Sequence, residues 1–181
     1  MSKTWFTSDH HFFHEKIIHH CKRPFSGQSE MNEWLISKWN SVVAPFDRVI
    51  HLGDLFWGKD TQSKRAVRNQ LNGRICLVPG NHDRPQLMLA EGLVDEVLGQ
   101  IHSETFEDSK GVRHLLVLCH YPMQEWDQFF RGSIHLHGHC HGNVPGQVTL
   151  SAPIKRLDVS VDLHDFKPLC VDQVLSRLGN Y

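Results

Sequence analysis

Histidines, aspartates and one asparagine follow short apolar runs at five places in the chain. Residues 136–142 read LHGHCHG, which places alternating imidazoles between glycines. Earlier segments read TSDHH at 7–11, HLGD at 51–54, PGNHD at 79–83 and LCHYP at 118–122. A divalent cation is rarely satisfied by two neighbouring residues, because its coordination shell needs four or more ligands. We therefore expect all five segments to meet at one metal site.

The residue types in these segments suit a pair of cations. Imidazole is the commonest metal ligand in proteins, and an asparagine carbonyl is a hard ligand that adds no negative charge. Two divalent ions about 3.5–4 Å apart need a bridging carboxylate, and they can polarise a phosphoryl group and generate a hydroxide nucleophile. The candidate ligands, in chain order, are Asp9, His11, Asp54, Asn81, His120, His139 and His141. The first two would hold one ion, Asp54 would bridge, the next two would hold the other ion, and the last two histidines would complete one ion each.

The composition favours one ordinary globular domain over residues 1–181. The chain is 40% hydrophobic and 22% charged, and its 15 histidines contrast with only two tyrosines. Its formal net charge is −1, so it lacks the global positive field that would hold an extended nucleic acid. We expect a small phosphorylated or nucleotide-like substrate instead of a long duplex.

The cysteines indicate a reducing compartment. There are five, an odd number, and no two are spaced as C-x-x-C, which argues against a disulfide framework and a zinc knuckle. No apolar run approaches the length of a membrane-spanning helix, and polar residues begin before any signal-like segment could form. These features predict a cytoplasmic protein with no membrane association.

The first half of the chain alternates between predicted strands and helices. Strands are expected at 3–7, 48–52 and 74–78, with an amphipathic helix at 31–43 and another at 61–71. This alternation is typical of a parallel sheet, whose ligand-binding residues lie beyond the carboxyl ends of its strands. Asp83 is expected to cap a short helix that runs to about residue 91.

The second half has a different pattern. A closing helix is expected around 171–178, and the strand-like segments are 94–98, 101–106, 112–119, 134–137, 147–150 and 157–161. The pattern predicts an α/β domain in which two β-sheets lie between helical layers.

The order of the five motifs resembles that of the calcineurin-like metallophosphoesterase family. D-x-H at 9–11, GD at 53–54, GNHD at 80–83, the isolated His120 and GHCH at 138–141 match the motifs of that family. The segments 8–14 and 23–25 look most like a small bacterial and phage branch. The resemblance implies a four-layer αββα sandwich, with two mixed sheets flanked by helices, and a dinuclear site that hydrolyses phosphate esters.

The same resemblance gives His82 a role other than metal binding. His82 would face the substrate and would stabilise the pentavalent phosphoryl group or protonate the leaving oxygen, while a metal-bridging hydroxide attacks in line. The segment 55–58, LFWG, lacks the acidic and arginine pattern found at this position in the protein Ser/Thr phosphatases. A phosphoprotein substrate is therefore disfavoured.

Two further residues are candidates for substrate binding. His14 is suggested by the branch resemblance, against the alternative of a histidine on a helix surface. Arg23 could clamp a phosphate with its planar guanidinium, against the alternative of a solvated surface group. His10, His137 and Cys140 adjoin candidate ligands, and we interpret all three as structural or supporting residues.

The sequence thus predicts a metal-dependent phosphoesterase for a small phosphate monoester or diester. Mn²⁺ suits the mixed ligand set best, although Fe, Zn, Ni or Co would also be accepted. One alternative is a nuclease for short nucleic acid, which the missing basic stripe disfavours. Another is a non-enzymatic metal-binding protein, and a non-ligand His82 placed to meet a substrate would argue against it.

Overall fold

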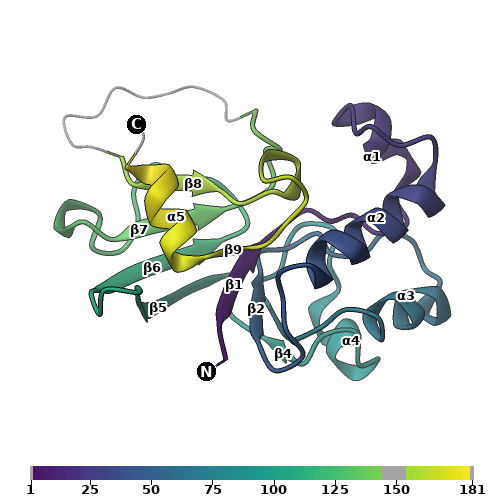
Figure 1. The fold of residues 1–181 in the computed structure, drawn as a ribbon, viewed down its shortest axis with the longest axis horizontal. Helices are drawn as coiled ribbons and strands as arrows, with labels where there is room; N and C mark the ends of the chain where they lie inside the picture. The colour runs from purple at the N-terminus through teal and green to yellow at the C-terminus, as the bar shows by residue number, and fades with distance from the viewer. Residues whose placement is uncertain (1, 144–153, 180–181) are drawn as a thin grey trace.

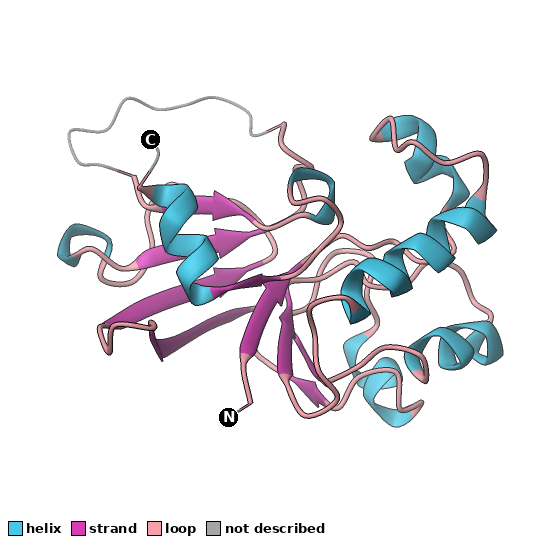
Figure 2. Ribbon diagram, viewed as in Figure 1, coloured by secondary structure: helices cyan, strands magenta, loops and turns pink. Residues whose placement is uncertain are grey.

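Two mixed β-sheets flanked by helices form the protein, as shown in a computed structural model that describes residues 2–143 and 154–179 (Figures 1 and 2). The first sheet has the order β4-β3-β2-β1-β9. Its strands are β1 (Thr4–Thr7), β2 (Arg48–His51), β3 (Arg74–Leu77), β4 (Glu96–Val97) and β9 (Leu169–Cys170). The second sheet has the order β5-β6-β7-β8. Its strands are β5 (Ile101–Glu107), β6 (Arg113–Cys119), β7 (Ile134–His137) and β8 (Arg156–Asp158).

The three central strands of the first sheet end at one edge. Strands β1, β2 and β3 are parallel, and Thr7 pairs with His51, which in turn pairs with Leu77. Because side chains that follow parallel strands leave the sheet at the same edge, the loops after these strands are brought together. Strand β9 is antiparallel to β1 and makes the sheet mixed.

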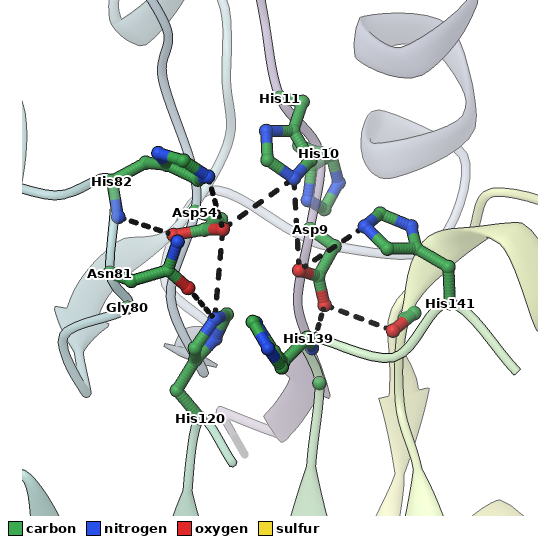
Figure 3. A network of polar contacts seen from close by, with 12 residues as sticks. Asp9, His10, His11, Asp54, Gly80, Asn81, His82, His120, His139 and His141 are labelled. Carbon is green, nitrogen blue, oxygen red and sulfur yellow. Dashed lines mark hydrogen bonds and ion pairs between the residues drawn. The ribbon is translucent and has the colours of Figure 1, made fainter. Parts of the chain in front are cut away.

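The second sheet consists of an antiparallel hairpin followed by parallel strands. Strands β5 and β6 are antiparallel and are joined by a turn at 108–111. Strands β6, β7 and β8 are parallel, so that Cys119 and His137 end their strands at a common edge. This edge faces the corresponding edge of the first sheet, and the candidate ligands lie between them (Figure 3).

Successive side chains of β1 point to opposite faces of the first sheet, and both faces are buried. Trp5 points into the core on the helix side, and Phe6 points into the core between the sheets. The helix side is covered by α1 (Glu15–His20), α2 (Gln28–Asn40), α3 (Thr61–Arg68) and α4 (Pro85–Ala90) (Figure 1). In α2, Met31, Leu35 and Trp39 recur every four residues and are fully buried.

The other layers pack against the second sheet. Phe6 and Ile50 meet Leu116, Leu118 and Leu136 in the core between the two sheets. On the outer face, Val117 is covered by Trp126 and Phe129 of a segment that includes the 3-10 helix η1 (Phe129–Arg131). Helix α5 (Val171–Leu178) contacts β1, β8 and β9, and its Val174 is buried against them. The predicted α/β fold with two mixed sheets and flanking helices is therefore confirmed.

Several predicted boundaries differ from the structure. Strand β8 ends at Asp158, before the second 3-10 helix η2 (Val161–Leu163), and the predicted strand 147–150 lies outside the described residues. The two-residue strand β9 was not predicted, because so short a segment has no readable period. None of the helices in the described ranges is long and apolar enough to cross a membrane.

The cap predicted at Asp83 was wrong. Helix α4 begins at Pro85 with Arg84 before it and without a side-chain cap. The Asp83 carboxylate instead accepts the backbone N–H groups of Asp54 at 2.8 Å and Gly80 at 2.9 Å. These hydrogen bonds hold the loop after β2 against the loop after β3.

Candidate metal centre

The seven candidate ligands lie together where the strand ends of the two sheets meet (Figure 3). Five strands deliver them: β1 is followed by Asp9 and His11, β2 by Asp54, β3 by Asn81, β6 by His120, and β7 by His139 and His141. Asp9 and His139, which are 130 residues apart in the chain, are in direct contact there. The sequence alone predicted this convergence from the positions of the apolar runs.

The backbone is strained at most of these ligands. Among the described residues, ten non-glycine residues have positive φ, and half of them are candidate ligands: Asp9, His11, Asp54, His139 and His141. The left-handed region costs an L-residue free energy, and such conformations persist where the surrounding contacts impose them. The side chains are thus held in place by loops that the surrounding packing constrains.

Two motif glycines allow the loops to approach one another. Gly53 has φ +93°, and a Cβ there would lie 2.6 Å from both the Cα of Gly80 and the Nδ1 of His120. A Cβ at Gly138 would collide with the carboxylate of Asp9 and the side chain of Ser8. Glycine is required at both positions because the ligands occupy the space that a side chain would fill.

The two carboxylate oxygens of Asp9 have different surroundings. Its Oδ2 accepts the backbone N–H of His139 at 2.9 Å and lies 2.9 Å from the Oγ of Ser160. Its Oδ1 has no hydrogen-bond partner among the described residues and faces the Nε2 atoms of His11 at 3.8 Å and His141 at 3.7 Å. One oxygen is anchored, and the other is free to bind a cation.

Asp54 occupies the middle of the centre. Its Oδ1 accepts the backbone N–H of His82 at 3.0 Å. Its Oδ2 lies 3.6 Å from the Nε2 of His11 on one side and 3.6 Å from the Nε2 of His120 on the other. Burial raises the pKa of Asp54, and the nearby carboxylate of Asp9 adds to the rise. A cation on either side of Oδ2 would offset the cost of this buried negative charge.

His120 and Asn81 present two acceptors to each other. The Nδ1 of His120 lies 2.7 Å from the carbonyl oxygen of Leu52, which can only accept, so that Nδ1 carries the proton. In the neutral ring, Nε2 is then an acceptor, and it lies 3.0 Å from the Oδ1 of Asn81. Two lone pairs that face one another are satisfied by a shared cation. The His139 ring stands 5.1 Å from the His120 ring.

The geometry fits two divalent ions. Separations of 3.6–3.8 Å between carboxylate oxygens and imidazole nitrogens exceed a hydrogen bond, but they suit two ligands that each lie about 2.0–2.2 Å from one ion. Asp9, His11 and His141 can converge on one ion, and Asp9, Asp54 and His120 form a second group. Burial, together with the neighbouring His141, lowers the pKa of His11 and keeps its ring in the neutral form that binds metals.

His82 stands beside the centre without joining either group. Its side chain is 38% exposed, and its Nε2 lies 3.9 Å from the Oδ2 of Asp54. The Trp57 ring contacts the His82 ring edge-on, with 4.7 Å between the centroids. The His14 ring stacks on the Trp57 indole, with 3.9 Å between the centroids. These three rings form one continuous surface next to the ligands.

Arg23 does not occupy the position predicted for a phosphate clamp. The residue is 5% exposed, and its guanidinium binds the carboxylate of Asp162 and the backbone carbonyls of Asp9 and His10. These contacts use the polar face that a substrate would need. Arg23 therefore supports the loop that carries Asp9, and its position does not support a direct contact with substrate.

The three residues adjacent to ligands are placed as structural groups. The Nδ1 of His10 lies 2.9 Å from the Nε2 of His51, and the ring packs against Phe12. The Nδ1 of His137 lies 2.9 Å from the carbonyl oxygen of Gly138. Cys140 is half-buried, and burial raises the pKa of its thiol. Among the described residues, the groups close enough together to hold a cation do not include the Cys140 thiol.

Three residues that form hydrogen bonds to the candidate ligands were not predicted from the sequence. Asp83 ties down the backbone of Asp54, Ser160 contacts Asp9, and Asp162 contacts His141. A partial signal existed, because residues 158–162 read DVSVD, with polar residues at every second position of a predicted strand. That pattern also fits a half-exposed strand, so it could not identify these contacts.

Comparison with known proteins agrees with the geometry. The family model described as calcineurin-like phosphoesterase matches residues 2–143. An uncharacterized protein of Methanocaldococcus jannaschii is 34% identical over 180 residues, which cover 98% of this chain and 92% of that protein. The Gene 66 protein of Mycobacterium phage D29 is 29% identical, with 93% of each chain covered.

A solved structure also resembles the whole chain. The crystal structure of a protein of unknown function from Aquifex aeolicus superimposes with a TM-score of 0.72 at 27% identity, covering 98% of this chain and all of that one. The match to the family spans all five motifs, from the aspartate after β1 to the histidines after β7. The chain therefore belongs to the calcineurin-like phosphoesterase family.

Proposed function

We propose that the protein is a dinuclear metal-dependent phosphoesterase that hydrolyses a small phosphate monoester or diester. The position of Asp54 is the main support for this proposal. Its Oδ2 lies at the same distance, 3.6 Å, from the ring nitrogens of His11 and His120, which come from different sheets. A carboxylate oxygen between two sets of ligands is what a bridged pair of ions requires.

The ligands divide into two sets around that oxygen. Asp9, His11 and His141 would hold the first ion, and Asn81, His120 and His139 the second, with Asp54 shared. When bound, the ions would polarise the phosphoryl group and lower the pKa of water enough to supply a nucleophile at neutral pH. We propose Mn²⁺ as the bound ion, and the mixed nitrogen and oxygen donors would also accept Fe, Zn, Ni or Co.

His82 is the group that would act on the substrate. Its ring is exposed at the mouth of the centre, close to the bridging carboxylate, yet it belongs to neither ligand set. A ring in this position can donate a hydrogen bond to the phosphoryl oxygens or a proton to the leaving group. A purely structural metal site would not need a free imidazole here, and this favours an enzyme over a metal-storage protein.

The neighbouring aromatic rings would contact the part of the substrate beyond the phosphate. The Trp57 side chain is 36% exposed and is supported by His14 on one face. Burial lowers the pKa of His14 to about 4, and the nearby His82 contributes to the shift. His14 would therefore offer stacking and hydrogen bonding instead of a positive charge. Such a surface suits a small ester with a flat group, such as a nucleotide.

A substrate screen tests the proposal. Purified protein, stripped of metal and then reconstituted with Mn²⁺, Ni²⁺, Co²⁺ or Zn²⁺, is assayed against p-nitrophenyl phosphate, bis-p-nitrophenyl phosphate, nucleotides and cyclic nucleotides. We expect turnover of at least one ester with at least one metal. A short single-stranded oligonucleotide in the same screen tests the nuclease alternative. The absence of ester turnover with every metal would overturn the proposal.

A further inference from the structure

A buried ion pair lies directly behind one of the candidate ligands. Asp162, in η2, accepts the Nε–H of Arg23 at 2.7 Å through Oδ1 and the Nη2–H at 2.9 Å through Oδ2. The Arg23 side chain is fully buried and that of Asp162 is 10% exposed. Two parallel hydrogen bonds of this kind fix the plane of the carboxylate as well as its position.

The same carboxylate orients His141. The Oδ2 of Asp162 lies 2.6 Å from the Nδ1 of His141. A carboxylate paired with an arginine is ionised and can only accept, so the Nδ1 of His141 must donate. Nε2 is left to face the free oxygen of Asp9, 3.7 Å away. The contact thus selects both the tautomer and the direction of the ring.

Arg23 joins this histidine to the opposite side of the centre. Its Nη2 donates to the backbone carbonyl of Asp9 at 2.7 Å, and its Nη1 donates to that of His10 at 2.8 Å. One guanidinium therefore spans the loop after β1 and the carboxylate that holds the loop after β7. Arg23 therefore helps to set the relative placement of Asp9 and His141, together with the hydrogen bond from the His139 backbone to Asp9.

We propose that Asp162, held by Arg23, is a positioning residue that sets the affinity of the ion bound by Asp9, His11 and His141. This inference rests on the dinuclear site of the proposed function. A hydrogen bond donated by the far N–H of a ligating histidine to a carboxylate raises the basicity of the ring and removes its rotational freedom. In the described part of the chain, neither Arg23 nor Asp162 makes a hydrogen bond to Asn81, His120 or His139, which would hold the second ion.

Asp162 is not itself a ligand in this arrangement. The thiol of Cys21, a ring nitrogen of His141 and a carboxylate oxygen of Asp162 lie within 4.8 Å of one another, which would permit a separate cation site. However, both oxygens of Asp162 already bind Arg23, and a cation there would lie against a guanidinium. Electrostatic repulsion excludes that occupant, and the carboxylate acts through His141 instead.

The test measures metal binding directly. Metal-free protein is titrated with Mn²⁺, and the two dissociation constants are followed by isothermal calorimetry and by the electron paramagnetic resonance signal of free Mn²⁺. The variants are Asp162→Ala, which removes the acceptor, and Asp162→Asn, which keeps an acceptor for His141 but removes the charge. The matched control is Asp165→Asn, because Asp165 lies three residues further on and, within residues 2–143 and 154–179, forms ion pairs only with Lys38 and Lys167.

We expect Asp162→Ala to weaken one ion by about 10–100-fold and the other by less than about threefold. Asp162→Asn should recover part of the loss, and Asp165→Asn should match the wild type. His141→Ala and His139→Ala identify the two ions, and the Asp162→Ala isotherm should resemble that of His141→Ala. If Asp162→Ala does not fold, Arg23→Lys provides the same test, because lysine cannot make the paired contacts.

Two results would overturn the inference. One is an unchanged pair of dissociation constants in Asp162→Ala, and the other is an equal weakening of both ions, which would indicate a general loss of structure. Neither result depends on turnover of an ester. Wild-type protein that binds two ions but hydrolyses no phosphate ester would contradict the proposed function and leave the role of Asp162 measurable.

Discussion

His82 meets Asp54 through two different parts of the residue. Its backbone N–H donates to the Oδ1 of Asp54 at 3.0 Å, while its ring Nε2 lies 3.9 Å from the Oδ2 of the same carboxylate. The backbone contact helps to hold the carboxylate that we propose as the bridge, and the ring faces the proposed position of the substrate. Because only the second contact involves the side chain, metal binding and catalysis can be separated by mutation.

His82→Ala should bind two ions and turn over slowly. The backbone bond to Asp54 survives the substitution, so the metal content should match the wild type, whereas kcat should fall by about 10²–10⁴ through loss of proton transfer or hydrogen bonding. His82→Gln keeps a hydrogen-bond donor but cannot titrate, so its kcat should lie between that of the wild type and that of His82→Ala. Metal analysis and steady-state kinetics on the same preparations check this. Unchanged turnover in His82→Ala would remove the catalytic role.

Asp54→Asn should weaken both ions together. The substitution removes the negative charge from the oxygen that lies between His11 and His120, and each ion loses the same ligand. Mn²⁺ titration of metal-free protein should therefore show losses of at least about tenfold at both sites. Asp127→Asn, on an exposed loop, is the control. Loss of only one ion would refute the ligand assignment.

Gly53→Ala should destabilise the fold and the centre at once. The new methyl group would lie 2.6 Å from the backbone of Gly80 and from the ring of His120, at a φ of +93°. We expect a loss of about 2–4 kcal/mol in urea unfolding, together with weaker metal binding. Gly58→Ala has φ +77° but open space around its Cβ, so it should cost only about 1–2 kcal/mol. Equal costs for the two variants would contradict the steric argument.

His14→Ala should raise KM with little change in metal content. The substitution removes the ring that supports Trp57, while the hydrogen bonds that hold Asp9, Asp54 and His120 do not involve His14. With a substrate that carries an aromatic or base group, KM should rise about 3–10-fold, as expected for the loss of one stacking contact. His20→Ala, at the exposed end of α1, is the control. An unchanged KM for every substrate would exclude His14 from the binding surface.

Buried His135 should make stability depend on pH. Burial lowers the pKa of His135 to about 4, and its Nε2 must remain an acceptor for the backbone N–H of Met123. Between pH 6.5 and about 4 the unfolded chain binds a proton at this residue that the folded chain does not. Stability should therefore fall as the pH falls through this window, by up to about 3 kcal/mol from this group.

The measurement compares wild type with His135→Asn. Urea unfolding of metal-free protein at several pH values between 4 and 7.5 gives the slope of stability against pH. Asparagine can still donate to the carbonyl of Val117, which accepts the Nδ1–H of the histidine, but it cannot titrate. The variant should show a flatter slope below pH 6.5, and an identical slope would place the titrating groups elsewhere.

The sequence allowed the first-sheet strands and the candidate ligands to be predicted together. Each of the strands β1, β2 and β3 is a short apolar run followed closely by a polar residue, and parallel register brings those residues to one edge. The same logic placed His120 after β6 and His139 after β7. The prediction needed only local patterns and the geometry of parallel sheets.

Arg23 and Asp83 show where local reasoning failed. Asp83 precedes a helix with proline at its first position, which is a usual position for a capping residue, yet it binds a neighbouring loop instead. Arg23 lies in a loop where an exposed side chain is the common outcome. Its partner Asp162 is 139 residues away in the chain, and no local pattern records that contact.

Strand patterns and motif spellings are local properties, so the possible ligands and the order in which the strands deliver them could be read from the sequence. The position of one Asp54 oxygen between two imidazoles, and the support of His141 by Arg23 and Asp162, follow from the three-dimensional packing. These relationships join loops from both sheets. They are set by how the two sheets pack against each other, through a core whose contacts are distant in the chain.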